Sequence, residues 1–190
     1  MQNDLAILIL AAGSSSRLGH PKQLVTYQNE TLLRRSVKQA LTLTSHVFVV
    51  LGHAYETCAS HLEGLPVTLL YHEAYTKGIG SSIAFGIAHI GLFDNTLIML
   101  CDQPLIPLEH YRALMGKAGQ EVLVASSYLP KERVAVPAIF PKRYYEQLMA
   151  LSGDKGAQML LSDVSCIHVA LKQEFTVDID TQEDIAKYLH

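Results

Sequence analysis

The chain has 190 residues, of which 49% are hydrophobic, and a mean hydropathy of +0.18, which suits one substantial buried core better than two. Its formal charge of -3 provides no broad basic face, which argues against a general attraction to nucleic acid. Its three cysteines form neither a zinc pattern nor a disulfide framework, and its first apolar run is too short for a membrane span, so we expect an unprocessed cytoplasmic protein that binds no membrane.

Short apolar runs alternate with segments of helical spacing over the first two thirds of the chain. We expect strands at 5–10, 46–52, 66–72, 96–102 and 121–126, and helices at 31–43, 54–64, 81–90 and 108–119. This alternation predicts an α/β fold with a mostly parallel, right-handed sheet covered on both faces, a three-layer, Rossmann-like arrangement. Ligands of such sheets bind beyond the carboxyl ends of the strands.

The pattern changes after about residue 128. Residues 134–140 are typical of a strand, and because this strand contains Pro137 we expect it at an edge of the sheet. Residues 144–163 predict a helix interrupted near its middle. The chain then continues through two apolar segments to a short helix that begins at Thr181 with acidic residues in its first turn.

The sequence LAAGSSSRLGHPK, residues 10–22, follows the first expected strand. Its glycines and serines allow successive backbone N–H groups to form an anion nest, and Arg17 and Lys22 add positive charge at its mouth. The spacing matches neither the Walker loop nor the G-x-G-x-x-G dinucleotide loop. The segment therefore predicts a nucleoside triphosphate site of another type, and the alternative is a serine-rich turn that binds nothing.

Candidate metal-binding carboxylates occur at two further places in the sequence. Asp102 ends the fourth strand, where it could hold Mg²⁺ together with phosphate oxygens and water, or cap the turn before Pro104. Asp178 and Asp180 are two residues apart, so on an extended segment both face one way, and a cation would relieve their repulsion. The alternative is helix capping by Asp180 and Thr181, which could coexist with metal binding.

The segment TKGIGSSIAFG, residues 76–86, runs from a loop into a helix. Its free N–H groups and hydroxyls could bind a base or a ribose, while the alternative is that Ser81 serves only as an N-cap. The nine histidines show no metal-binding spacing, and we assign none of them to a metal.

Five segments in the same order resemble the MobA-like nucleotidyltransferase family, and within it the molybdenum cofactor cytidylyltransferase branch. They are LAAGSSSRLGHPK, KGIGSSIAFGI, CDQP, LSGDKGAQMLL and DIDTQED, and they cover nearly the whole chain. The resemblance implies a fold of the nucleotide-diphospho-sugar transferase type. It also implies a single domain over residues 1–190, with a nucleotide-binding part at about 1–127 and an acceptor-side lobe at about 128–190.

The resemblance also implies roles for individual residues. Catalytic roles would fall to Arg17, Lys22 and Asp102, and Mg²⁺ would bind to Asp102 and Asp180. The implied nucleotide-binding residues are Leu10, Ala11, Ala12, Gly13, Ser14, Ser15, Arg17, Lys22, Gly80, Ser81 and Asp102.

The implied reaction moves CMP from CTP to a phosphorylated acceptor, molybdopterin, and releases pyrophosphate. The two-alanine form of the first motif favours CTP over GTP. A molybdoenzyme would be the client for the product.

Three residues depart from the family pattern: Gln158 replaces an arginine, Ala135 a glycine and Gln182 a proline. The first two lie in the expected acceptor lobe, so they weaken the assignment of molybdopterin more than that of a nucleotide. Two alternatives therefore stay open, namely transfer to a sugar or polyol phosphate and a non-catalytic escort of the molybdenum cofactor. A large aromatic- and amide-lined pocket in 128–158 would favour a pterin, and a small hydroxyl-reading pocket a sugar.

Overall fold

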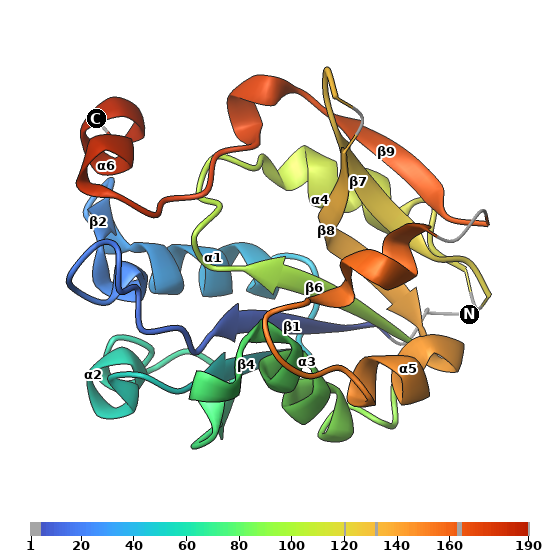
Figure 1. Cartoon of the computed structure of the whole chain (residues 1–190), viewed down its shortest axis with the longest axis horizontal. Coiled ribbons are helices and arrows are strands. Elements are labelled where there is room, and N and C mark those ends of the chain that lie inside the picture. The colour runs from blue at the N-terminus through green and yellow to red at the C-terminus, as the bar shows by residue number, and fades with distance from the viewer. Residues whose placement is uncertain (1–4, 120, 132, 163–164, 190) are drawn as a thin grey trace.

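A seven-stranded sheet forms the centre of the computed structural model, which describes residues 5–119, 121–131, 133–162 and 165–189 (Figure 1). The strand order is β5-β4-β1-β6-β8-β7-β9, and all neighbours are parallel except at β8, which runs antiparallel to both β6 and β7. The strands are β1 (Leu5–Ala11), β4 (Val47–Leu51), β5 (Thr68–Tyr71), β6 (Asn95–Leu100), β7 (Val124–Tyr128), β8 (Arg133–Pro141) and β9 (Ile167–Leu171). The mostly parallel sheet is thus confirmed.

Helices cover both faces of the sheet, which confirms the three layers. One face carries α1 (Leu32–Leu41), α2 (Tyr55–Ser60) and α4 (Leu108–Met115), and the other carries α3 (Ile79–Ala88), α5 (Tyr145–Met149) and the 3-10 helix η4 (Ala157–Ser162). Side chains alternate along β1, so Ile7 and Ile9 pack into the first layer and Leu8 and Leu10 into the second. Burial on both sides accounts for the unbroken apolar sequence of this strand.

The expected edge position of residues 134–140 is wrong, because β8 lies inside the sheet between β6 and β7. Pairing with β6 ends at Ala138, and the register with β7 shifts so that Ala125 pairs with Ala138 while Ser126 pairs with Ala135. Pro137 therefore sits in a β-bulge, where its missing N–H interrupts no ladder hydrogen bond. The edges of the sheet are β5 and β9.

The last helix, α6 (Gln182–Tyr188), lies against the N-terminal part of the chain (Figure 1). Its Ile185 and the preceding Ile179 pack with Leu18 and Val25, beside the short hairpin of β2 (Thr26–Tyr27) and β3 (Glu30–Thr31). This return of the chain carries the VDIDTQED segment to the loop that follows β1.

The carboxyl ends of β1 and β6 mark the change in strand order, because β4 and β5 lie on one side of β1 and β6 lies on the other. Open α/β sheets bind their ligands at such a point. In the described part of the chain, no helix is both long enough and apolar enough to cross a bilayer.

Candidate functional site

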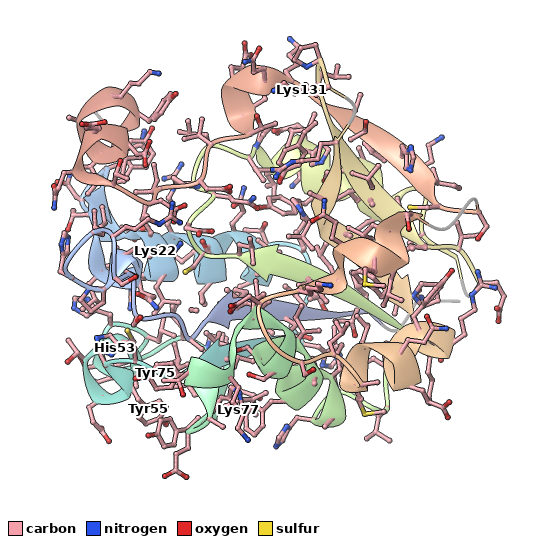
Figure 2. The ribbon with its side chains drawn as sticks, in the orientation of Figure 1. Lys22, His53, Tyr55, Tyr75, Lys77 and Lys131 are labelled. Carbon is pink, nitrogen blue, oxygen red and sulfur yellow. The ribbon has the colours of Figure 1, made fainter. Side chains whose placement is uncertain are left out.

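Ser15 closes the loop that follows β1. It has a φ of 55°, in the left-handed region, and its carbonyl accepts hydrogen bonds from the N–H groups of Leu18 at 2.9 Å and Gly19 at 3.2 Å. Its hydroxyl accepts one from the N–H of Lys22 at 3.0 Å. The loop therefore turns back and places Lys22 at the start of the 3-10 helix η1 (Lys22–Leu24), near the carboxyl end of β6 (Figure 2).

Gln23, which was not among the residues predicted for the site, holds the other side of this loop. Its side chain is fully buried, and its Nε2 donates hydrogen bonds to the backbone oxygens of Ala11 and Gly13, both at 2.8 Å. These two bonds tie the end of β1 to η1. The only signal in the sequence is the position of Gln23 directly after Lys22.

Lys22 joins two carboxylates from distant parts of the chain. Its Nζ donates to Oδ2 of Asp102 and, at 2.9 Å, to Oδ1 of Asp180. Arg17 donates through Nη2 to the other oxygen of Asp180, Oδ2, at 2.7 Å. The backbone N–H of Ile179 donates to the carbonyl of Asp102 at 2.9 Å, which fixes the segment before α6 against the end of β6. The structure thus brings together all four charged residues that the sequence predicted for the site.

The neighbouring charges shift the pKa of two of these groups. Burial would lower the pKa of Lys22, but its attraction to Asp102 and its hydrogen bonds to both carboxylates outweigh burial, so this pKa is raised. Burial would raise the pKa of Asp180, but the hydrogen bond and charge of Lys22, with the charge of Arg17, lower it overall. Lys22 and Asp180 therefore both remain charged at neutral pH.

Asp102 keeps one carboxylate oxygen without a partner. The residue is 8% exposed, and its Oδ1 is buried and accepts no hydrogen bond from the described residues. Its other oxygen is bound to Lys22, so the side chain does not cap the turn before Pro104, which was the alternative. A buried carboxylate oxygen without a partner is costly, and a cation would relieve that cost.

A cavity of about 410 Å³ lies over the carboxyl ends of β1 and β6. A Cβ added to Gly13 would meet no atom within 4 Å, so the loop itself leaves this space open. Of the residues predicted to bind a nucleotide, those that line the cavity are Leu10, Ala11, Ala12, Gly13, Ser14, Lys22 and Asp102. Gln23 and Tyr75, which also line it, were not among the residues predicted for the site, whereas the lining residues Thr76 and Asp154 lie in two of the motif segments.

Gly80 and Ser81 lie behind the wall of this cavity, and their part in nucleotide binding stays a prediction. The N–H of Gly80 donates to the carbonyl of Gly153 at 2.9 Å. The hydroxyl of Ser81 donates to the carbonyl of Gly78 at 2.8 Å and lies 3.1 Å from Nε2 of His72. The alternative of Ser81 as an N-cap is wrong, because α3 begins at Ile79 with Gly78 as its N-cap.

A second cavity of about 260 Å³ adjoins the first and shares Leu10, Ile79 and Leu100 with it. Strands β6, β7 and β8 and helix η4 supply most of its walls. Its polar lining residues are Gln103, Tyr128, Arg133, Gln158 and Asp178.

Asp178 thus faces the second cavity, whereas Asp180 binds Lys22 and Arg17. Its Oδ1 accepts a hydrogen bond from Nε2 of Gln103 at 2.8 Å. Burial and the charge of Asp102 raise the pKa of Asp178, and the hydrogen bond from Gln103 opposes them.

Comparison with known proteins decides the family of this chain. The family model for the MobA-like NTP transferase domain matches residues 7–170. The chain belongs to the MobA-like NTP transferase family.

Relatives agree with this membership. A probable molybdenum cofactor guanylyltransferase of Bacillus cereus strain AH820 is 26% identical over 187 residues, which cover 93% of this chain and 92% of that protein. The bifunctional protein GlmU of Neisseria meningitidis is 33% identical over 124 residues, which cover 64% of this chain but only 27% of GlmU. The crystal structure of Rv0371c from Mycobacterium tuberculosis matches with a TM-score of 0.87 at 25% identity and covers 100% of this chain and 98% of that one.

This MobA-like protein is therefore a nucleotidyltransferase with the nucleotide-diphospho-sugar transferase fold. Two of its three departures from the family pattern, Ala135 and Gln158, line the second cavity. The third, Gln182, is the first residue of α6, which begins with a capping box between Thr181 and Asp184. That box fixes the start of the helix without the usual proline.

Proposed function

We propose that this nucleotidyltransferase moves CMP from CTP to a molybdopterin-type phosphate, with Mg²⁺, and releases pyrophosphate. The observation that carries the proposal is the ion-paired cluster of Arg17, Lys22, Asp102 and Asp180, of which Lys22 and Asp102 line the first cavity, next to a second cavity. The first cavity would hold the triphosphate, and the second would hold the acceptor.

The reaction needs no nucleophile from the protein. A phosphate monoester has a second pKa of about 6 and is mostly dianionic at neutral pH. One of its oxygens attacks the α-phosphorus, and the bond from that phosphorus to the bridging oxygen of the β-phosphate breaks as pyrophosphate leaves. Arg17 and Lys22 would donate to phosphate oxygens and stabilise the charge that grows on the leaving group, while the loop from Ala11 to Ser15 positions the triphosphate.

Asp102 and Asp180 would hold Mg²⁺. Mg²⁺ uses one or two carboxylates and completes its coordination with phosphate oxygens and water. The unpartnered Oδ1 of Asp102 fits this role, and the described residues include no group of three His, Cys, Asp or Glu side chains that would form an all-protein site. When bound, the cation neutralises charge on the reacting phosphates.

Of the features expected for a pterin pocket, the second cavity has two amides, Gln103 and Gln158, but only Tyr128 as an aromatic lining residue among those described, so its apolar wall is what supports a flat heterocyclic acceptor over a sugar. Most of its wall is apolar, and its polar groups are two amides, one tyrosine, one arginine and one aspartate. A sugar or polyol would bury several hydroxyls and need a polar partner for each, whereas a planar ring buries apolar faces and places its polar groups at its edge. A molybdoenzyme would receive the product.

The identity of the nucleotide rests on the first motif. The two alanines, Ala11 and Ala12, favour CTP, whereas the relative from Bacillus cereus bears the name of a guanylyltransferase. GTP is therefore the alternative assignment of the nucleotide substrate.

Calorimetric titration with CTP, GTP, UTP and ATP, each with and without Mg²⁺, tests the proposal. We expect magnesium-dependent binding that prefers CTP. Tighter binding of GTP than of CTP would assign the protein to the guanylyl branch. Binding of none of the four nucleotides would overturn the triphosphate site itself.

A further inference from the structure

The amide of Gln103 is held in one orientation at the wall of the second cavity. This residue is 5% exposed and follows Asp102 directly in the sequence. Its Nε2 donates hydrogen bonds to Oη of Tyr128 at 2.9 Å and to Oδ1 of Asp178 at 2.8 Å. The hydroxyl of Tyr128 in turn donates its proton to the carbonyl of Val136. Both N–H groups of the amide and the proton of the tyrosine are therefore committed.

A flipped amide would not fit this arrangement. It would place Oε1 of Gln103 against a carboxylate oxygen of Asp178 and against Oη of Tyr128, whose proton is directed to Val136. Three acceptors would then face one another. The network thus determines which end of the amide has no partner in the described part of the protein, and that end is the carbonyl.

Oε1 of Gln103 is buried and has no hydrogen-bond partner within the described part of the chain. A buried acceptor without a donor destabilises the site, because the group has lost its hydrogen bonds to water. Much of the cavity wall beside it is apolar, formed by Ile79, Ile83, Leu100, Val136 and Leu161. A ligand that brings a hydrogen-bond donor to Oε1 would satisfy this acceptor and be stabilised by the new hydrogen bond.

We infer that Gln103 determines acceptor specificity by accepting, at Oε1, a hydrogen bond from an amino group on the edge of a flat, nitrogen-containing ring. Asp178 and Tyr128 are positioning residues, because they act by fixing the amide. This inference rests on the proposed function, which places the acceptor in the second cavity, and adds the chemical group by which the acceptor is recognised. A ring that presents a carbonyl oxygen at the same position would face Oε1 with a second acceptor and be rejected.

The test compares two ligands with three proteins by fluorescence titration in the presence of CTP and Mg²⁺. The ligands are 6,7-dimethylpterin and 6,7-dimethyllumazine, which carry an amino group and a carbonyl oxygen, respectively, at the same ring position. The proteins are the unmodified chain, Gln103→Met and the control Gln39→Met. Gln39 is a partly buried amide that donates to the carbonyl of Ile106 and does not line the second cavity.

We expect the unmodified chain and Gln39→Met to prefer the pterin by about 10-fold, and Gln103→Met to lose this preference. If Gln103 had only a structural role, Gln103→Met would weaken the binding of both ligands equally. An unchanged preference for the pterin in Gln103→Met would therefore overturn the inference and leave the proposed function standing. Tyr128→Phe serves as a second variant, because it releases one N–H of the amide and should reduce the preference in part. Failure of the unmodified chain to bind either ring, while it still binds CTP, would instead overturn the pterin-type acceptor and the inference with it.

Discussion

Lys22 and Asp102 are 80 residues apart in the sequence, yet the ammonium of one donates to the carboxylate of the other at the wall of the first cavity. The same ammonium also reaches Asp180, so a single side chain joins the first loop, the end of β6 and the segment before α6. Its removal should therefore affect the site more than removal of any surface lysine.

Lys22→Met should weaken CTP binding by about 1–3 kcal/mol, the scale of a lost charge-assisted hydrogen bond. Titration calorimetry measures the change. Lys38→Met is the matched control, because Lys38 pairs with Glu30 on an exposed face of α1 and should leave the affinity unchanged. An equal affinity in all three proteins would place Lys22 outside the phosphate site.

Asp102→Asn should lower the rate of nucleotide transfer by about 100-fold or more, because it removes negative charge at the position proposed for the cation. The rate of pyrophosphate release measures this effect. Asp94→Asn, which changes an exposed aspartate in the loop before β6, should retain full activity. Transfer that continues at the normal rate in Asp102→Asn would refute the proposed mechanism.

His110 should make the protein less stable in acid. It is 6% exposed, and burial lowers its pKa from 6.5 to about 4. The hydroxyl of Ser126 donates to the carbonyl of Pro137, so it accepts a hydrogen bond from Nε2–H of the neutral imidazole. Protonation is easier in the unfolded chain, so this contribution to stability is complete above pH 6.5 and is lost as the pH falls toward 4.

The expected loss of unfolding free energy from His110 is about 3 kcal/mol by pH 4. Urea unfolding at a series of pH values between 7 and 4 measures it. His110→Gln cannot titrate, so its stability should fall less over the same interval. Parallel curves for the two proteins would show that His110 does not cause the acid sensitivity.

Gly80→Ala should destabilise the fold by about 1–3 kcal/mol, because the new methyl group would meet rigid backbone. A Cβ at Gly80 would lie 2.8 Å from the carbonyl oxygen of Lys155 and 2.9 Å from that of Ser152. Gly91 is the matched control, since a Cβ there would meet no atom within 4 Å. Chemical unfolding measures the stabilities of Gly80→Ala and Gly91→Ala. Equal stabilities would mean that the loop at 152–155 moves aside without any loss of unfolding free energy.

The sequence predicted the sheet and the charged site because both depend on local patterns. Unbroken apolar runs indicated strands buried on both faces, and the carboxyl ends of parallel strands meet at one edge, which placed Lys22 near Asp102 in advance. The position of β8 could not be predicted in this way, because whether Pro137 interrupts a ladder depends on the register of its neighbours. That register places it in the bulge opposite Ala125 and Ser126.

Gln23 and Gln103 escaped prediction for a related reason. The residues next to Gln23 in the sequence do not show that it binds the carbonyls of Ala11 and Gly13. Those next to Gln103 do not show that it lies between Tyr128 and Asp178. A glutamine is usually a surface residue, and its role becomes visible only when the distant partners are placed in space.

The bond from the N–H of Ile179 to the carbonyl of Asp102 also has a consequence for how the protein is made. On the ribosome, β1, α1 and the first loop emerge long before residues 178–184. Until those residues have left the exit tunnel, Lys22 has only Asp102 as a carboxylate partner, and Arg17 lacks its partner Asp180. A nascent chain can therefore pair β1, β4, β5 and β6 early, but it adds β9 and acquires a complete set of charges only near the end of translation.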